Sequence, residues 1–243
     1  MLQLKTKLPQ YFFKRKGMRN LIVLVVVSII LSGCKKAASE GIYEKGRIEY
    51  KIQYIENNHN HISSTLLPKK MKLEFNQEYS TNVIEGFMGV FRLNSVINFK
   101  HKRCSTLLEI LNKNYLFKGK RGDEMCCFEP MNKMEIAYTE ETKQIAGLNC
   151  KKAIIKLPEK NEKFEVYYTN DIRLSNANIS NPYSDIDGVM MDFQLNLTGL
   201  KMKFTAEKFE KDNNIKPHKL KVPDNCTIVT RQQMVQIINK LME

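Results

Sequence analysis

Apolar and polar residues alternate with a period of two in many short segments of this chain. In the segment from Gly46 to Ile55, the side chains of Ile48, Tyr50, Ile52 and Tyr54 fall on one face, as in a half-buried strand. Similar runs follow at 71–75, 81–84, 90–97, 115–117, 134–138, 150–157, 164–168, 189–197 and 200–209. They are separated by the turn residues Gly86, Gly119, Gly122, Gly147, Pro158, Gly188 and Gly199. The pattern predicts about nine or ten strands.

A helical period is clear only near the end of the chain. Met234, Ile237, Ile238 and Leu241 form an apolar stripe, and Thr230 stands where a helix cap is expected. We also expect a second, short helix over Thr106 to Leu111. Because few long helical patterns lie between the strands, the sequence favours an antiparallel meander over βαβ units.

One apolar run does not fit the alternating pattern. It extends from Leu21 to Leu31, and as a helix rising about 1.5 Å per residue it covers only about 17 Å of a hydrocarbon core of about 30 Å. Six basic residues and no acidic residue precede it, and Ser32 and Gly33 follow it. This order of basic, apolar and small residues is that of a secretory signal. A short buried helix is the alternative interpretation.

The residues Leu31-Ser32-Gly33-Cys34 resemble the lipobox of bacterial lipoproteins. The resemblance implies that residues 1–33 are a signal peptide that is removed and that Cys34 is the site of lipid attachment. Several acyl chains hold a protein firmly on a bilayer, because each buried CH₂ contributes about 0.8 kcal/mol. We expect residues 34–45 to be a polar tether and residues 46–243 to form a single β-rich domain.

Removal of the signal peptide on export would lower the net positive charge of the chain. Without residues 1–33, 210 residues remain and the formal net charge falls from +13 to +7. The remaining lysines are scattered through alternating segments, which is typical of solvated strand faces. Since an exported protein does not meet nucleic acid and no basic stripe carries interleaved aromatic residues, we predict no nucleic-acid partner.

The cysteines Cys104, Cys126, Cys127, Cys150 and Cys226 remain if Cys34 is acylated. Five cysteines leave at least one unpaired within the chain. A disulfide ring between the neighbours Cys126 and Cys127 would be strained, so we expect each of them to be reduced or to pair elsewhere.

The familiar catalytic motifs are absent: no G-x-S-x-G, P-loop, G-x-G-x-x-G or H-E-x-x-H occurs. Soft sulfur ligands gather between Met125 and Met134, and Cys126, Cys127, Met131 and Met134 are candidates for binding Cu(I). The alternative is that these side chains simply fill the core.

Three weaker candidates have ordinary alternatives. His59 and His61 lie on one face of an extended segment, but the asparagines around them indicate a solvated loop. Arg121-Gly122-Asp123 spells an adhesion tripeptide and is also a basic turn. Two carboxylate pairs suit acid–base or Ca²⁺ chemistry, and we expect both to lie in solvated turns; they are Glu140 with Glu141 and Asp185 with Asp187.

Four segments together resemble a known group of proteins: residues 46–51, residues 142–153, residues 167–172, and residues 181–183 leading to 188–193. They are similar to uncharacterised lipoproteins of Bacteroidetes, including GLPGLI-type and DUF4412-like families. The resemblance implies a mainly β fold with one curved antiparallel sheet, similar to the LolA/LolB-like half-barrels. It also implies an outer-membrane lipoprotein that faces the periplasm.

These observations predict a lipid-anchored, non-catalytic binding module without a cofactor. Its partners would be the membrane, through Cys34, and a hydrophobic small molecule such as a lipid or an envelope protein. Seven aromatic residues are candidates for the ligand face, although ordinary core is the expected role of each one taken alone: Tyr50, Tyr54, Phe75, Phe87, Phe91, Phe193 and Phe204. The alternative function is a copper or thiol-redox module that uses residues 125–134.

Overall fold

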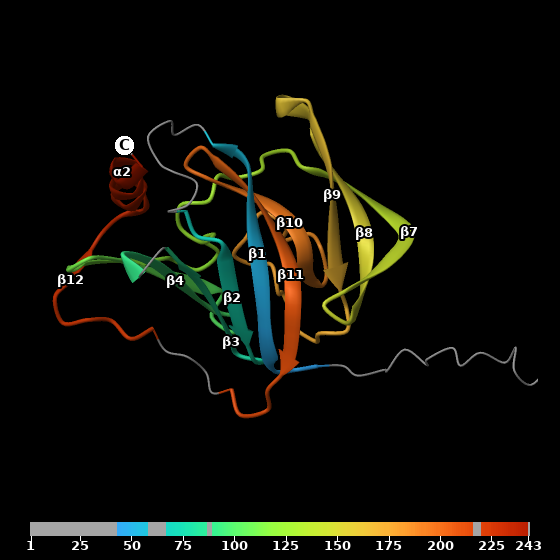
Figure 1. Cartoon of the computed structure of the whole chain (residues 1–243), viewed down its shortest axis with the longest axis horizontal. Coiled ribbons are helices and arrows are strands. Elements are labelled where there is room, and N and C mark those ends of the chain that lie inside the picture. Colours follow the sequence, from blue (N-terminus) through green and yellow to red (C-terminus); the bar gives the residue numbers. More distant parts are fainter. Residues whose placement is uncertain (1–42, 58–66, 87–88, 216–219, 243) are drawn as a thin grey trace, which may run out of the picture. The chain divides into compact units, whose positions relative to one another are not determined.

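Twelve strands form one sheet in the computed structural model, which describes residues 43–57, 67–86, 89–215 and 220–242 (Figure 1). The strands are β1 (Gly46–Asn57), β2 (Lys70–Phe75), β3 (Tyr79–Glu85), β4 (Phe91–Asn98), β5 (Arg103–Ile110), β6 (Lys113–Lys118), β7 (Glu135–Ile145), β8 (Leu148–Leu157), β9 (Glu162–Thr169), β10 (Val189–Leu197), β11 (Leu200–Lys211) and β12 (Cys226–Ile228). The 3-10 helix η2 (Pro158–Lys160) follows β8, and the helix α2 (Arg231–Met242) follows β12.

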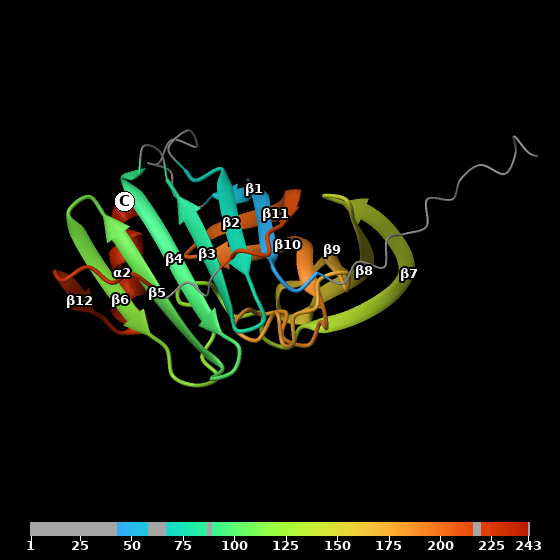
Figure 2. The same ribbon diagram turned by 90° about the horizontal axis from the view of Figure 1, so that it is seen from below.

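The sheet is curved and does not close into a barrel, which confirms the predicted fold class. Its strand order is β12-β6-β5-β4-β3-β2-β1-β11-β10-β9-β8-β7, and Figure 2 shows this order from one side of the sheet to the other. The neighbours pair antiparallel except at one edge, where the short β12 pairs in parallel with β6. The described residues belong to one compact unit, Glu40–Glu243.

The inner face of the sheet carries the large apolar side chains. Ile48, Tyr50, Phe75 and Phe204 are at most 2% exposed there. Three segments cover this face: residues 120–134 between β6 and β7, residues 170–188 between β9 and β10, and α2. The sheet therefore shields its apolar side with parts of its own chain.

The chain after β11 passes around one edge of the sheet. Leu220 and Val222 first border a groove on the outer face together with Val96 and Leu107. The chain then joins the sheet as β12, and α2 lies over the inner face, where Arg231 contacts the ring of Phe117. Both faces near β5 and β6 are thus covered by one C-terminal segment.

The helix expected over Thr106 to Leu111 is wrong, because these residues lie in β5 up to Ile110. Thr106, Leu107 and Leu108 are all buried, since both faces of β5 are covered. A strand that is buried on both sides does not alternate, and its sequence is easily mistaken for a buried helix.

Candidate binding site

The segment with the clustered sulfur atoms, residues 120–134, crosses the inner face of the sheet, and we call it the strap. The Met125 N–H donates a 2.7 Å hydrogen bond to the Ser180 carbonyl, and the Glu129 N–H donates one of 2.8 Å to the Asn196 carbonyl. Between these points Met125, Cys126, Cys127 and Phe128 are buried. These side chains fill space between the sheet and the segments above it.

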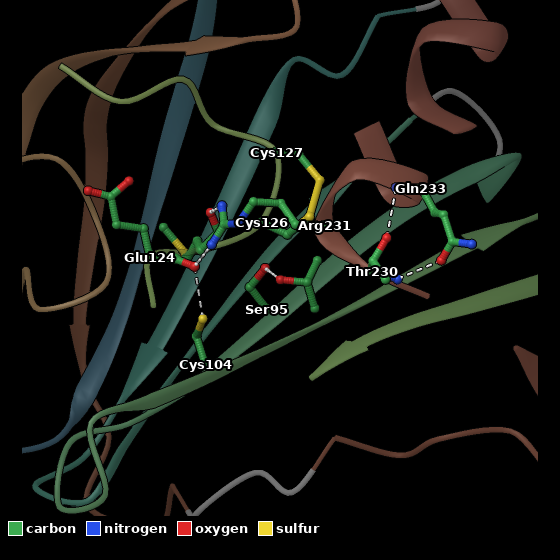
Figure 3. Close-up of a disulfide and its surroundings, with 10 residues drawn as sticks. Ser95, Cys104, Glu124, Cys126, Cys127, Thr230, Arg231 and Gln233 are labelled. Atoms are coloured by element: carbon green, nitrogen blue, oxygen red, sulfur yellow. Dashed lines mark hydrogen bonds between the residues drawn. A yellow bond between two sulfur atoms is a disulfide. The ribbon is translucent and has the colours of Figure 1, made fainter. Parts of the chain in front are cut away.

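Cys126 and Cys127 form a disulfide with each other, which corrects the expectation that neighbouring cysteines would not pair (Figure 3). The backbone of Cys127 has φ 80, in the left-handed region that residues other than glycine rarely adopt. The local turn brings the two side chains to the same side of the chain. A sequence pattern does not reveal such a backbone conformation.

Arg231, the first residue of α2, ties the helix to the strap. Its guanidinium donates hydrogen bonds of 2.6 Å to the Glu124 carbonyl and 3.0 Å to the Met125 carbonyl. The guanidinium also lies over the ring of Phe117, with its carbon 5.2 Å from the ring centre. These contacts hold the beginning of α2 directly above the residues that precede the disulfide.

The thiol of Cys104 supports the strap from the sheet. It donates a 3.1 Å hydrogen bond to the Glu124 carbonyl (Figure 3). Burial raises the pKa of this thiol to about 11, and the charge of Arg231 acts in the opposite direction. Cys104 is therefore a neutral hydrogen-bond donor at physiological pH and not a thiolate nucleophile.

An open groove of about 830 Å³ lies between the strap and α2. Phe128, Pro130, Val235 and Cys127 supply apolar and sulfur-containing surface, and Arg231 and Asn239 supply hydrogen-bond donors. The complete lining is Glu124, Cys127, Phe128, Glu129, Pro130, Thr198, Arg231, Val235 and Asn239. Its volume falls in the range of about 300–1,000 Å³ that is common for small-molecule sites.

The charges along the groove differ in how they are compensated. One carboxylate oxygen of Glu129 accepts a 2.9 Å hydrogen bond from the Asn196 amide, the other accepts one of 3.3 Å from the Gly199 N–H, and Lys160 lies 3.7 Å away. The hydrogen-bond partners of Arg231, in contrast, are neutral carbonyl groups. The groove lining therefore contains a guanidinium that bonds to carbonyl groups, and it also contains Glu124.

The inner face itself leaves little room for a ligand. A cavity of about 60 Å³ remains between the sheet and the segments that cover it, with Tyr50 and Phe193 in its wall. Such a volume suits one or two water molecules. Of the predicted ligand-face residues, Tyr50, Phe75, Phe193 and Phe204 are buried in the core, Tyr54 and Phe91 pack against it, and Phe87 lies outside the described residues.

The four predicted copper ligands lie in the segment between β6 and β7. Cys126 and Cys127 are bonded to each other, and Met131 and Met134 are partly buried against the core. Within the described ranges, no group of three or more His, Cys, Asp or Glu side chains is arranged to hold a metal ion. His59 and His61 lie outside those ranges, as does Cys34.

The other sequence candidates have structural partners. Asp123 of the Arg121-Gly122-Asp123 turn accepts a 2.7 Å hydrogen bond from the Lys120 N–H. Glu141 lies 3.1 Å from Lys152 and accepts a hydrogen bond from Tyr167. Asp185 and Asp187 are exposed between β9 and β10, as expected for a solvated turn. The expectation of a turn is wrong for Glu140 and Glu141, because both lie in β7, where their side chains are exposed.

The sequence pattern indicates the wall of the groove formed by the strap but not the wall formed by α2. The Cys and Met cluster pointed to the strap, but Arg231 and Val235 were seen only as part of a terminal helix. They come within reach of the strap because β12 turns the chain around the edge of the sheet. A local sequence pattern does not predict the contact of Arg231 with Glu124 and Met125, which lie more than a hundred positions away.

No protein-family model and no curated protein matches this chain. One similar solved structure is that of PNGF-II, with 16% sequence identity and a TM-score of 0.46. The match covers 79% of this chain and 33% of the PNGF-II chain, so the chain spans about a third of that protein's length. A likeness this distant supports no conclusion about function. Among the described helices, none is long and apolar enough to cross a membrane.

Proposed function

We propose that this protein is a lipid-anchored lipoprotein of the cell envelope that binds a small hydrophobic ligand without catalysis. The sequence of residues 21–34 supports the anchor, through its apolar run and the cysteine that follows Leu31-Ser32-Gly33. The expected location is the outer membrane, on the side that faces the periplasm. These residues lie outside the described part of the chain, so the anchor rests on sequence alone.

The observation that carries the binding role is the groove beside the Cys126–Cys127 disulfide. It has a volume of about 830 Å³, and its lining combines apolar side chains with the polar or charged residues Glu124, Glu129, Thr198, Arg231 and Asn239. Concave sites of this size and mixed composition are typical of small-molecule binding. The cavity of about 60 Å³ below the strap is far too small for the same task.

The proposal includes no chemical step. The free thiols of Cys104 and Cys150 are buried, and burial raises their pKa values to about 11 and about 12. Neither is poised to act as a nucleophile, because the reactive form of cysteine is the thiolate. The alternative copper role requires that Cys126 and Cys127 be reduced first, since a disulfide offers no thiolate to a soft metal. A thiol-redox role would instead use the disulfide as the oxidised form and the two thiols as the reduced form.

A dye-binding titration tests the binding role. The mature chain from residue 34, with Cys34→Ser so that it carries no acyl chain of its own, is titrated with the neutral apolar dye N-phenyl-1-naphthylamine. We expect one saturable site that is lost in Val235→Glu, which places a carboxylate in the groove, and kept in Gln236→Glu, which adds the same charge at an exposed neighbouring position. Absence of a saturable site, or equal binding by both variants, would overturn the proposal.

The same sample tests the alternative copper role. After reduction and incubation with Cu(I), elemental analysis of the desalted protein measures the bound metal. A stoichiometric copper content that disappears in Cys126→Ser with Cys127→Ser would favour the metal module. A copper content that is the same in the wild type and in this variant would count against it.

A further inference from the structure

The lining of the groove combines charged and apolar groups, and this combination indicates what kind of ligand fits. It brings the guanidinium of Arg231 together with the apolar side chains of Phe128, Pro130 and Val235, and it also includes Glu124 and Glu129. A positive charge beside apolar surface matches an anionic amphiphile rather than a wholly apolar molecule.

The guanidinium of Arg231 has N–H groups beyond the two bonds that it makes to the strap. A guanidinium carries five N–H donors, and Arg231 uses two of its nitrogen atoms to hold the carbonyls of Glu124 and Met125. The remaining donors are available to a carboxylate, which pairs with arginine in a planar, charge-assisted geometry. A ligand can therefore bind without displacing the contacts that position Arg231.

The neighbouring acidic side chains do not cancel this charge. Glu129 is held by Asn196, by the Gly199 N–H and by Lys160. Figure 3 shows the Glu124 side chain pointing away from the Arg231 guanidinium. The first turn of α2 contains no acidic residue, so the partial positive charge at the beginning of the helix adds to that of Arg231.

We infer that the groove binds a single-chain anionic amphiphile of the fatty-acid class, with its carboxylate on Arg231 and its alkyl chain along Phe128, Pro130 and Val235. This inference rests on the proposed function and adds the chemical class of the ligand. The guanidinium supplies a charge-assisted pair, and the walls supply apolar surface for the chain.

A headgroup series with a constant chain tests the inference on the wild-type protein. Decanoate, decan-1-ol and decyltrimethylammonium compete with N-phenyl-1-naphthylamine for the mature chain carrying Cys34→Ser. We expect decanoate to displace the dye at a concentration at least tenfold lower than decan-1-ol, with decyltrimethylammonium the weakest. Equal potency of the three compounds, or a preference for the cation, would overturn the inference.

The outcomes distinguish a failure of the predicted carboxylate preference from a failure of the proposed binding function. If the dye binds and all three compounds displace it equally, the groove binds hydrophobic ligands and only the carboxylate preference is wrong. If the dye shows no saturable site, the proposed function fails as well.

A variant then assigns the preference to one side chain. Arg231→Gln should reduce the ratio between decanoate and decan-1-ol to within twofold while the dye still binds. Arg121→Gln, which removes the same charge from an exposed turn, should leave the ratio unchanged. If Arg231→Gln fails to fold, as judged by circular dichroism, Val235→Glu replaces it. Because the dye site is lost in this variant, isothermal titration calorimetry measures decanoate directly, and Val235→Glu should bind it at least tenfold more weakly than Gln236→Glu does. An unchanged ratio in a folded Arg231→Gln protein, or equal weakening by the two glutamate variants, would overturn the assignment.

Discussion

The guanidinium of Arg231 donates a 2.6 Å hydrogen bond to the carbonyl of Glu124, across 107 positions of the chain. This bond joins the first residue of α2 to the strap that carries the Cys126–Cys127 disulfide. The same guanidinium lies over Phe117 on the inner face of β6. Sheet, strap and helix therefore meet at one side chain.

Arg231→Gln should destabilise the fold by about 2 kcal/mol, because hydrogen bonds to a charged group are lost and two carbonyls lose a donor. Chemical denaturation of the variant and the wild type measures the difference. The matched control is Arg121→Gln, since Arg121 is exposed in a turn and should change stability by no more than about 0.5 kcal/mol. A loss of similar size in both variants would show that Arg231 does not hold α2 in place.

The residues before and inside α2 form a reciprocal cap. The Gln233 N–H donates a 3.2 Å hydrogen bond to the Thr230 hydroxyl, and the Thr230 N–H donates one of 2.8 Å to the Gln233 side chain (Figure 3). Thr230→Ala should therefore cost about 1 kcal/mol of unfolding free energy. Gln233→Ala should also lower the unfolding free energy, because it removes the other bond of the pair, and denaturant titration measures both losses. A variant of either residue without a measurable loss would contradict the reciprocal cap.

The sequence predicted those elements whose burial pattern lies within one segment of the chain. The alternation in Gly46 to Ile55 identifies β1, and the stripe from Met234 to Leu241 identifies α2, because burial on one face leaves its period in the sequence. β5 was misread since the C-terminal segment covers its second face. The groove was missed for a related reason, as its two walls meet only after β12 has joined the edge of the sheet.

The thiol of Cys104 makes the free energy of unfolding vary with pH in the alkaline range. Burial raises its pKa from 9.0 to about 11 in the folded protein, so the unfolded chain loses the proton at lower pH than the native state does. Stability from this group is complete below pH 9 and declines as the pH rises toward 11. The difference in unfolding free energy between the wild type and Cys104→Ala, measured from pH 8 to 11, should therefore shrink with rising pH. A difference that does not vary with pH would contradict the raised pKa.

The Cys126–Cys127 disulfide predicts a definite count of reactive thiols. Alkylation of the unfolded, non-reduced mature chain carrying Cys34→Ser should label Cys104, Cys150 and Cys226, and leave Cys126 and Cys127 unlabelled. After reduction all five should react, as read by intact mass and peptide mapping. Since Cys127 lines the groove, reduction should also weaken dye binding. Labelling of all five cysteines before reduction would show that the pair is absent.

Two glycines with positive φ should respond differently to alanine. Gly188, with φ +146, precedes β10, and an added Cβ would lie 2.7 Å from a ring carbon of Tyr168 and 2.9 Å from the Thr169 carbonyl oxygen. Gly122, with φ +86, has nothing within 4 Å of the same position. Gly122→Ala therefore adds only backbone strain, about 1 kcal/mol, whereas Gly188→Ala adds a collision and should cost about 3 kcal/mol or more. Denaturant titration of the two variants measures these losses. Equal losses would mean that the chain at Gly188 shifts easily, and that the packing of residues 170–188 against β9 is looser than the contacts of Gly188 indicate.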